Sequence, residues 1–169
     1  MGRSELILGG ARSGKSRFAQ ARAEQSNARL VYIATAQAFD EEMHDRIQLH
    51  QADRDGRWET IEAPIALCDA ISQRQGSGDT LLVDCLTLWT SNLILEGHDA
   101  ANAGKELCTA LQSYDGLIIL VANEVGLGIV PENALARRFR DEAGRLNQAV
   151  AASAEAVFFI AAGLPLRLK

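Results

Sequence analysis

The sequence predicts an α/β fold in which helices flank a mostly parallel central sheet. Short, continuously apolar runs such as residues 117–122 alternate along the chain with segments of helical periodicity. This alternation is typical of parallel strands that are covered on both faces. The chain has 169 residues, of which 47% are hydrophobic. Because this is enough to bury one core, we expect a single domain over residues 1–169.

The expected strands follow in order. Residues 6–8 form a short apolar run close to the initiator methionine, and further apolar runs lie at 30–34, 80–83, 117–122 and 156–161. Continuous runs of this length indicate buried strands. The segment 58–62 is short and has high β propensity. The sheet is therefore expected to end with the strand over 156–161.

The expected helices lie between these strands. A first helix is predicted over 17–25, and Asp40 is a candidate N-cap of a second that runs to about Arg54. Glycines at 76 and 78 close a helix over 66–74. Two further helices are expected over 86–95 and 102–114. On the long helix over 134–154, one apolar stripe should face the core: Leu135, Phe139, Ala143, Leu146 and Val150.

The segment between the first strand and the first helix is the strongest functional signal. It fits the pattern G-x-x-x-x-G-K-[ST] without a mismatch: Gly9, Gly10, Ala11, Arg12, Ser13, Gly14, Lys15 and Ser16. In a strand–loop–helix setting this pattern predicts a phosphate-binding loop whose backbone amides surround the phosphates of a nucleotide. Lys15 would add a cation for the β and γ oxygens, and the Ser16 hydroxyl would bind Mg²⁺.

Asp84 ends the apolar strand that precedes the helix over 86–95. In nucleotide-binding folds a carboxylate in this place orients Mg²⁺, directly or through water. An apolar strand followed by Asp is common, however, and the alternative is that Asp84 caps the helix that starts near Leu86. The residues alone leave both roles open.

Residues 123–133 follow a buried strand and combine two glycines, a proline and two carboxylates. Loops at the carboxyl ends of parallel strands form ligand crevices, which favours a functional loop. The alternative is a connector in which Glu132 caps the next helix. On that helix a second group of residues falls beside the apolar stripe: Arg137, Arg140, Asp141, Gly144 and Asn147. Arginines at this spacing suit contact with phosphate or another subunit, and the alternative is a solvated helix face.

His50 lies on the expected second helix, three residues after Ile47 and seven after Met43. It thus lies at the edge of an apolar stripe, where a single histidine usually has a structural role. A neutral imidazole can, however, attack phosphorus and carry a nucleotidyl group. His44 and His98 have no comparable neighbours, and the spacing of histidines and cysteines does not fit a zinc site.

Composition points to a cytoplasmic α/β domain rather than a nucleic-acid or membrane protein. The net charge is −5 without a basic run, so the footprint of a nucleic-acid-binding protein is absent. The longest apolar run, over 156–166, is too short to cross a bilayer, and no signal peptide is expected. The three cysteines, at 68, 85 and 108, contain no C-x-x-C pair, so we expect reduced thiols.

Taken together, these stretches resemble one family closely: the bifunctional adenosylcobinamide kinase/adenosylcobinamide-phosphate guanylyltransferases of cobalamin biosynthesis. The matching stretches span nearly the whole chain and lie at 9–17, 32–36, 45–50, 58–62, 84–87, 92–93 and 123–147. The phosphate loop is shared by many families, whereas the run over 123–133 is specific. The resemblance is poor over 66–79 and 96–116.

The resemblance implies two reactions. A nucleoside triphosphate, ATP or GTP, first phosphorylates the aminopropanol hydroxyl of adenosylcobinamide. GTP then gives GMP to a histidine that matches His50, and adenosylcobinamide phosphate takes up the GMP to form adenosylcobinamide-GDP. Some relatives carry two adjacent histidines here, whereas this chain has Leu49 before His50. The family also implies a P-loop NTPase with a RecA-like sheet, a homotrimer, Mg²⁺, and a role for Glu62 in positioning the base or the metal.

Two other classes of protein remain as alternatives. A P-loop small-molecule kinase without a covalent nucleotidyl step would usually carry an Arg-rich lid late in the chain, and no such segment is obvious in the sequence. A nucleotide switch would carry the guanine-reading motif N-K-x-D, but Asn123 is followed by Glu124.

Overall fold

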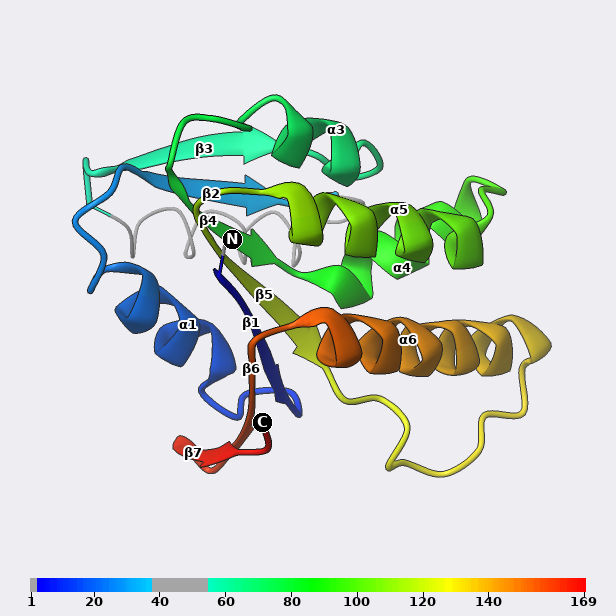
Figure 1. Ribbon diagram of the computed structural model, residues 1–169. Helices are drawn as coiled ribbons and strands as arrows, with labels where there is room; N and C mark the ends of the chain where they lie inside the picture. Colours follow the sequence, from blue (N-terminus) through cyan, green and yellow to red (C-terminus); the bar gives the residue numbers. More distant parts are fainter. Residues whose placement is uncertain (1–2, 38–54) are drawn as a thin grey trace.

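The computed structural model describes residues 3–37 and 55–169 (Figure 1). Its core is a seven-stranded sheet in the order β3-β2-β4-β5-β1-β6-β7. All strand pairs are parallel except β6–β7, which is antiparallel. The strands are β1 (Arg3–Gly9), β2 (Leu30–Ala34), β3 (Trp58–Glu62), β4 (Thr80–Asp84), β5 (Leu117–Asn123), β6 (Ala156–Ala161) and β7 (Leu164–Arg167).

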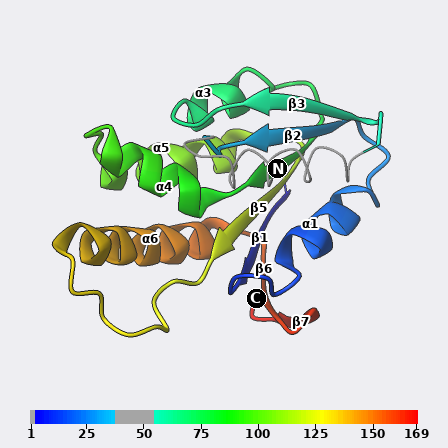
Figure 2. The ribbon, with the colours of Figure 1, turned by 180° about the vertical axis from the view of Figure 1, so that it is seen from behind.

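Helices cover both faces of the sheet, as Figures 1 and 2 show. On one face α1 (Lys15–Ala23) packs its buried Ala19 and Ala23 against β1 and β5. The other face carries α3 (Leu67–Ser72), α4 (Leu86–Leu95), α5 (Ala100–Ser113) and α6 (Ala134–Ser153). Trp89, Leu107 and Val150 from these helices belong to the larger core cluster. The predicted α/β fold with a mostly parallel sheet is thus confirmed.

An ion pair anchors α1 to the sheet. Arg22, in the last turn of α1, donates from Nη2 to Oε1 of the buried Glu5 on β1 at 2.6 Å, and its Nε pairs with the other carboxylate oxygen. The guanidinium also lies 4.8 Å from the ring centre of Phe158 on β6. The hydrogen bond to Glu5 raises the pKa of Arg22. The helix that follows the predicted phosphate loop is therefore fixed at its far end.

Most expected elements are present, with boundaries shifted by a few residues. The sheet does not end at β6, however, because residues 164–167 form the antiparallel strand β7. That strand escaped prediction because it is short and carries no buried residue, so its pattern lacks the signature of a core strand. The expected helix over 40–54 lies outside the described residues.

The predicted core stripe of α6 is correct only in its second half. Ala143, Leu146 and Val150 are buried, but Leu135 is 48% exposed. A helix of this length extends about 30 Å, whereas a seven-residue strand extends about 23 Å. The first turns of α6 therefore lie beyond the end of the sheet, as Figure 1 shows. Asn147, expected on the polar side, is buried instead.

No helix within residues 3–37 and 55–169 is both long and apolar enough to cross a membrane.

Candidate nucleotide-binding site

The predicted phosphate loop connects β1, which ends at Gly9, to α1, which begins at Lys15. Gly14 is the N-cap residue in the left-handed conformation, with φ of 93°. The Nζ of Lys15 donates to the carbonyl oxygen of Gly10 at 3.3 Å. The first turn of α1, which includes Ser16, begins directly after the loop, and the amides at a helix N-terminus point out of the helix at that end. This is the strand–loop–helix geometry that the motif requires.

Two glycines of the loop lie so close to neighbouring atoms that a side chain at either would require a neighbour to shift. A Cβ on Gly9 would lie 2.5 Å from Oγ of Ser13 and 2.8 Å from the carbonyl oxygen of Ile160. A Cβ on Gly14 would lie 3.2 Å from Cα of Gly163. In contrast, a Cβ on Gly10 would have no atom of the described part of the chain within 4 Å. The loop is therefore closely packed against β6 and open on the side of Gly10, where a ligand can approach the backbone.

Side-chain alternation places several strand ends on the face that carries α1. Every second residue of the central strands packs with Ala19 and Ala23 of α1, including Ile7, Tyr32, Leu82 and Val121. Successive side chains of a strand point to opposite faces. Four residues at the carboxyl ends of the strands lie an even number of positions from these residues and therefore also belong to the face that carries α1: Gly9, Glu62, Asp84 and Asn123.

Asp84 is half-buried at the end of β4, and it is not the cap of α4. Cys85 is the N-cap residue, and its Sγ accepts from the amide of Leu88 at 3.4 Å. The capping alternative for Asp84 is therefore wrong. Its carboxylate lies at the end of β4, which is the position that the predicted Mg²⁺ role requires.

A buried network holds the strand ends around Asp84. Oγ1 of Thr35 donates to the carbonyl oxygen of Cys85 at 2.7 Å and accepts from the amide of Cys85 at 2.8 Å. Nδ2 of Asn92 donates to the carbonyl oxygens of Thr35 at 2.8 Å and Pro64 at 3.0 Å. Thr35 and Asn92 were given no role from the sequence. The sequence signal for both residues is a polar side chain in apolar surroundings. Buried polar side chains are usually hydrogen-bonded, and here both bond backbone groups at the strand ends.

Ser16 and Asp84 fit a magnesium site of the nucleotide-dependent kind. Among residues 3–37 and 55–169, no group of three or more His, Cys, Asp or Glu side chains is placed to hold a metal ion. This part of the chain therefore offers no protein-only metal cage. A hydroxyl and a carboxylate supply the hard oxygen ligands that Mg²⁺ takes, and Mg²⁺ usually completes its shell with waters and substrate phosphates.

The loop after β5 is exposed and strongly apolar. Leu127 is 83% exposed and Ile129 is 97% exposed. Asn133 caps α6, because its Oδ1 accepts from the amides of Leu135 at 2.8 Å and Ala136 at 3.1 Å. The alternative that Glu132 caps this helix is therefore wrong, because the cap is Asn133.

Asn123 joins this loop to the phosphate loop. It pairs with Gly9 across the sheet, and the amide of Glu124 donates to the carbonyl oxygen of Gly9 at 3.1 Å. Thr87 and Asn147 hold the backbone of Asn123, through its amide at 2.7 Å and its carbonyl at 3.3 Å. The side-chain Oδ1 of Asn123 is buried without a hydrogen-bond partner in the described residues.

The predicted site residues are only partly brought together. The phosphate loop, Asp84 and Glu62 lie at one edge of the sheet on one face, with Glu62 exposed at the end of β3. His50 lies outside the described residues, so its placement relative to the loop stays a prediction. A Cβ on Gly144 would meet no atom within 4 Å in the described part of the chain, so close packing within that part does not account for a glycine in the middle of α6.

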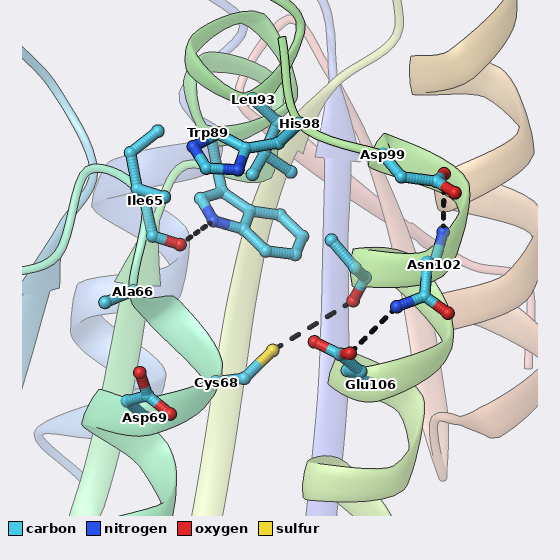
Figure 3. Close-up of a pocket in the computed structure, with 11 residues that line it drawn as sticks. Ile65, Ala66, Cys68, Asp69, Trp89, Leu93, His98, Asp99, Asn102 and Glu106 are labelled. Carbon is cyan, nitrogen blue, oxygen red and sulfur yellow. Dashed lines mark hydrogen bonds between the residues drawn. The ribbon is translucent and has the colours of Figure 1, made fainter. Parts of the chain in front are cut away.

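A pocket of about 350 Å³ lies between α3, α4 and α5 (Figure 3). Its walls include Cys68, Trp89, His98 and Glu106. Trp89 and α3 belong to the core on the face opposite α1, so this pocket is separate from the phosphate loop. Burial, with the nearby carboxylate of Glu106, raises the pKa of Cys68 to about 11. All three cysteines are free.

Solved structures share the fold of this chain. The flagellar accessory protein FlaH from Methanocaldococcus jannaschii has a TM-score of 0.56 at 14% identity, with 99% of this chain and 78% of that protein covered. The type III secretion ATPase EscN from enteropathogenic Escherichia coli has a TM-score of 0.60 at 9% identity, with 95% of this chain and 43% of that protein covered. The fold is that of a RecA-like P-loop NTPase.

Sequence relatives match over nearly the full length. The bifunctional adenosylcobalamin biosynthesis protein CobP of Pseudomonas aeruginosa is 50% identical over 167 residues, which cover 98% of this chain and 96% of the relative. The corresponding protein CobU of Escherichia coli is 40% identical over 179 aligned positions, which cover 97% of this chain and 98% of the relative. The family described as cobinamide kinase/cobinamide phosphate guanyltransferase matches residues 5–168. The chain therefore belongs to this family.

Proposed function

We propose that this protein catalyses two successive transfers in the assembly of cobalamin. In the first, a nucleoside triphosphate phosphorylates the aminopropanol hydroxyl of adenosylcobinamide. In the second, GMP from GTP is joined to the resulting phosphate, which gives adenosylcobinamide-GDP. The observation that carries this proposal is family membership over residues 5–168, on a chain whose phosphate loop has the required strand–loop–helix geometry.

In the phosphorylation step, the residues of the site position the triphosphate and neutralise its charge. The loop amides from Gly9 to Ser16 would surround the phosphates, and Lys15 would contact the β and γ oxygens. Ser16 and Asp84 would hold Mg²⁺, which supplies further charge neutralisation when bound. The hydroxyl oxygen of the substrate attacks the γ phosphorus, the bond to the β–γ bridging oxygen breaks, and the hydroxyl proton passes to solvent.

In the guanylyl step, His50 is proposed as the nucleophile. A neutral imidazole nitrogen attacks the α phosphorus of GTP, and pyrophosphate leaves. A phosphate oxygen of adenosylcobinamide phosphate then attacks the same phosphorus, and the histidine leaves. The support is the position of His50 in the stretch 45–50, which matches the family. Glu62, which is exposed on the same face as Asp84, is proposed to help position the guanine base or the metal.

We further propose a homotrimer in the cytoplasm. Apolar side chains on one segment are left uncovered in a single chain: Leu127, Ile129, Val130 and Leu135. An exposed apolar stretch of this kind is typical of an interaction surface, and the family resemblance implies three copies. Light scattering on the purified protein tests the trimer, and an active monomer in dilute solution would contradict it.

The proposed location in the cytoplasm is supported by the three free cysteines, which fit a reducing compartment.

Incubation with GTP labelled at the α phosphorus tests the covalent step. We expect a protein-bound label that is lost in acid and survives mild base, as a phosphorus–nitrogen bond would be. Phosphorylation of adenosylcobinamide without any such label would favour the P-loop small-molecule kinase. That second candidate shares the phosphate loop and lacks only the histidine step.

A further inference from the structure

The last hairpin of the chain contacts the phosphate loop directly. β6 and β7 are joined by a tight turn at Ala162 and Gly163, whose φ angles are 51° and 78°. Two successive residues with positive φ are typical of a type I′ hairpin turn. The amide of Gly163 donates to the carbonyl oxygen of Ser13 at 2.8 Å. A residue of the loop and a residue 150 positions later are thus joined through their backbones.

Close packing surrounds this hydrogen bond. The place of a Cβ on Gly14 lies 3.2 Å from Cα of Gly163, and that of a Cβ on Gly9 lies 2.8 Å from the carbonyl oxygen of Ile160. The side chain of Ser13 does not hold the loop, because its buried Oγ has no hydrogen-bond partner among the described residues. On the side of β6, backbone contacts with the hairpin therefore define the position of the loop.

We infer that the β6–β7 turn is a positioning element for the phosphate loop and that Gly163 is its key residue. This inference rests on the proposed function, because it requires that the loop binds nucleotide phosphates. Loop amides bind a phosphate well only when they are held in the productive arrangement beforehand. The turn supplies that arrangement by fixing the carbonyl of Ser13, two residues before Lys15.

The physical basis for a test is backbone strain at Gly163. A β-branched residue is strongly disfavoured at positive φ. With valine at position 163, the turn can relieve this strain by changing conformation and releasing Ser13. A nucleotide that needs the ordered loop must then restore the strained turn, so the strain reduces its affinity. The coupling is reciprocal, so nucleotide binding should also order the turn.

Gly76 provides a matched control. Its φ is 81°, close to the 78° of Gly163, and its amide also donates a hydrogen bond, to Oδ1 of Asp115 at 3.2 Å. Neither glycine has an atom of the described residues within 4 Å of its Cβ position. Gly76 follows α3, away from the phosphate loop. A Cβ at either site therefore introduces similar backbone strain and meets no neighbouring atom of the described residues, but only position 163 contacts the loop.

The experiment compares Gly163→Val with Gly76→Val, and measures GTP and ATP binding by calorimetry well below the melting temperature. Both variants should melt earlier than the unchanged protein. Only Gly163→Val should raise the nucleotide Kd, by about fivefold or more. An unchanged Kd in Gly163→Val, or an equal rise in both variants, would overturn the inference. If the valine variant does not fold, Gly163→Ala is compared with Gly76→Ala by the same criteria.

Hydrogen exchange on the unchanged protein gives an independent readout. Added nucleotide should slow exchange in the peptide that contains Gly163 and leave the peptide that contains Gly76 unchanged. Unaltered exchange at Gly163 in a protein that binds nucleotide would contradict the coupling. The two failures are distinguishable: if the unchanged protein binds no nucleotide, the proposed function fails, whereas normal binding by Gly163→Val removes only the role of the turn.

Discussion

Glu62 and Asp84 pair with the same residue, Ala34, from opposite sides of β2. Their Cα atoms are two strand spacings apart, about 10 Å. By the alternation of side chains along a strand, both belong to the sheet face that packs against α1. Two carboxylates thus flank one strand end on the face that carries the phosphate loop, which is where a nucleotide and its metal ion would lie.

Lys15→Ala should abolish triphosphate-dependent activity while the fold remains. In the structure its Nζ donates to the carbonyl oxygen of Gly10 within the loop at 3.3 Å, and its proposed role is to contact the β and γ phosphates. We expect kcat/KM to fall by about a hundredfold or more, with an unchanged circular dichroism spectrum. Lys105→Ala, at an exposed position on α5, is the control. Near-normal turnover in Lys15→Ala would remove the phosphate-loop assignment.

Asp84→Asn should weaken Mg²⁺-dependent turnover far more than it weakens folding. Cys85 rather than Asp84 caps α4, so no capping energy is at stake. The Mg²⁺ concentration for half-maximal activity should rise, as measured by titration at saturating nucleotide. Asp99 is a suitable contrast, because its carboxylate caps α5 by accepting from the amide of Asn102 at 3.0 Å. Asp99→Ala should lose about 1 kcal/mol of stability and keep its Mg²⁺ dependence.

Asn123→Leu and Asn147→Leu should affect the free energy of unfolding in different ways. The Oδ1 of Asn123 is a buried acceptor without a partner among the described residues, so leucine removes an uncompensated desolvation cost. We expect unchanged or higher stability. The Nδ2 of Asn147 donates to the carbonyl of Asn123 at 3.3 Å, so its removal should cost about 1 kcal/mol. Urea denaturation measures both, and equal destabilisation would contradict this account.

His50→Ala should lose the GMP adduct and guanylyl transfer but keep phosphorylation, which does not pass through the histidine. In the unchanged protein, loading with GMP should decrease as the pH falls below the ordinary pKa of an imidazole, about 6.5. The protonated ring has no lone pair for the attack, so the sign of the effect is loss at low pH. Mass spectrometry after incubation with GTP detects the adduct. Full loading of His50→Ala would exclude this nucleophile.

Local sequence determined much of the fold. The phosphate loop and the positions of strands β2 and β4 could be predicted, because a glycine pattern and a continuous apolar run act within one short segment. The helix α4 was predicted with the bounds Leu86–Leu95. Resemblance added the family, which the comparisons confirmed.

Tertiary structure alone decided the order of the strands. β5 lies between β1 and β4, and this order depends on how helices pack over the sheet rather than on any one segment. The same long-range packing aligned Glu62 with Asp84 across Ala34. Sequence patterns have no access to such contacts, because the partners are far apart along the chain.

Three further features also needed the structure. The cap of α4 is Cys85 and that of α6 is Asn133, since capping depends on backbone angles that composition does not specify. The exposed start of α6 follows from a helix longer than the sheet it covers. The contact of Gly163 with Ser13 joins opposite ends of the chain. Sequence by itself thus determined the residue pattern and the position of the phosphate loop between a strand and a helix, and only tertiary packing decided what holds that loop in place.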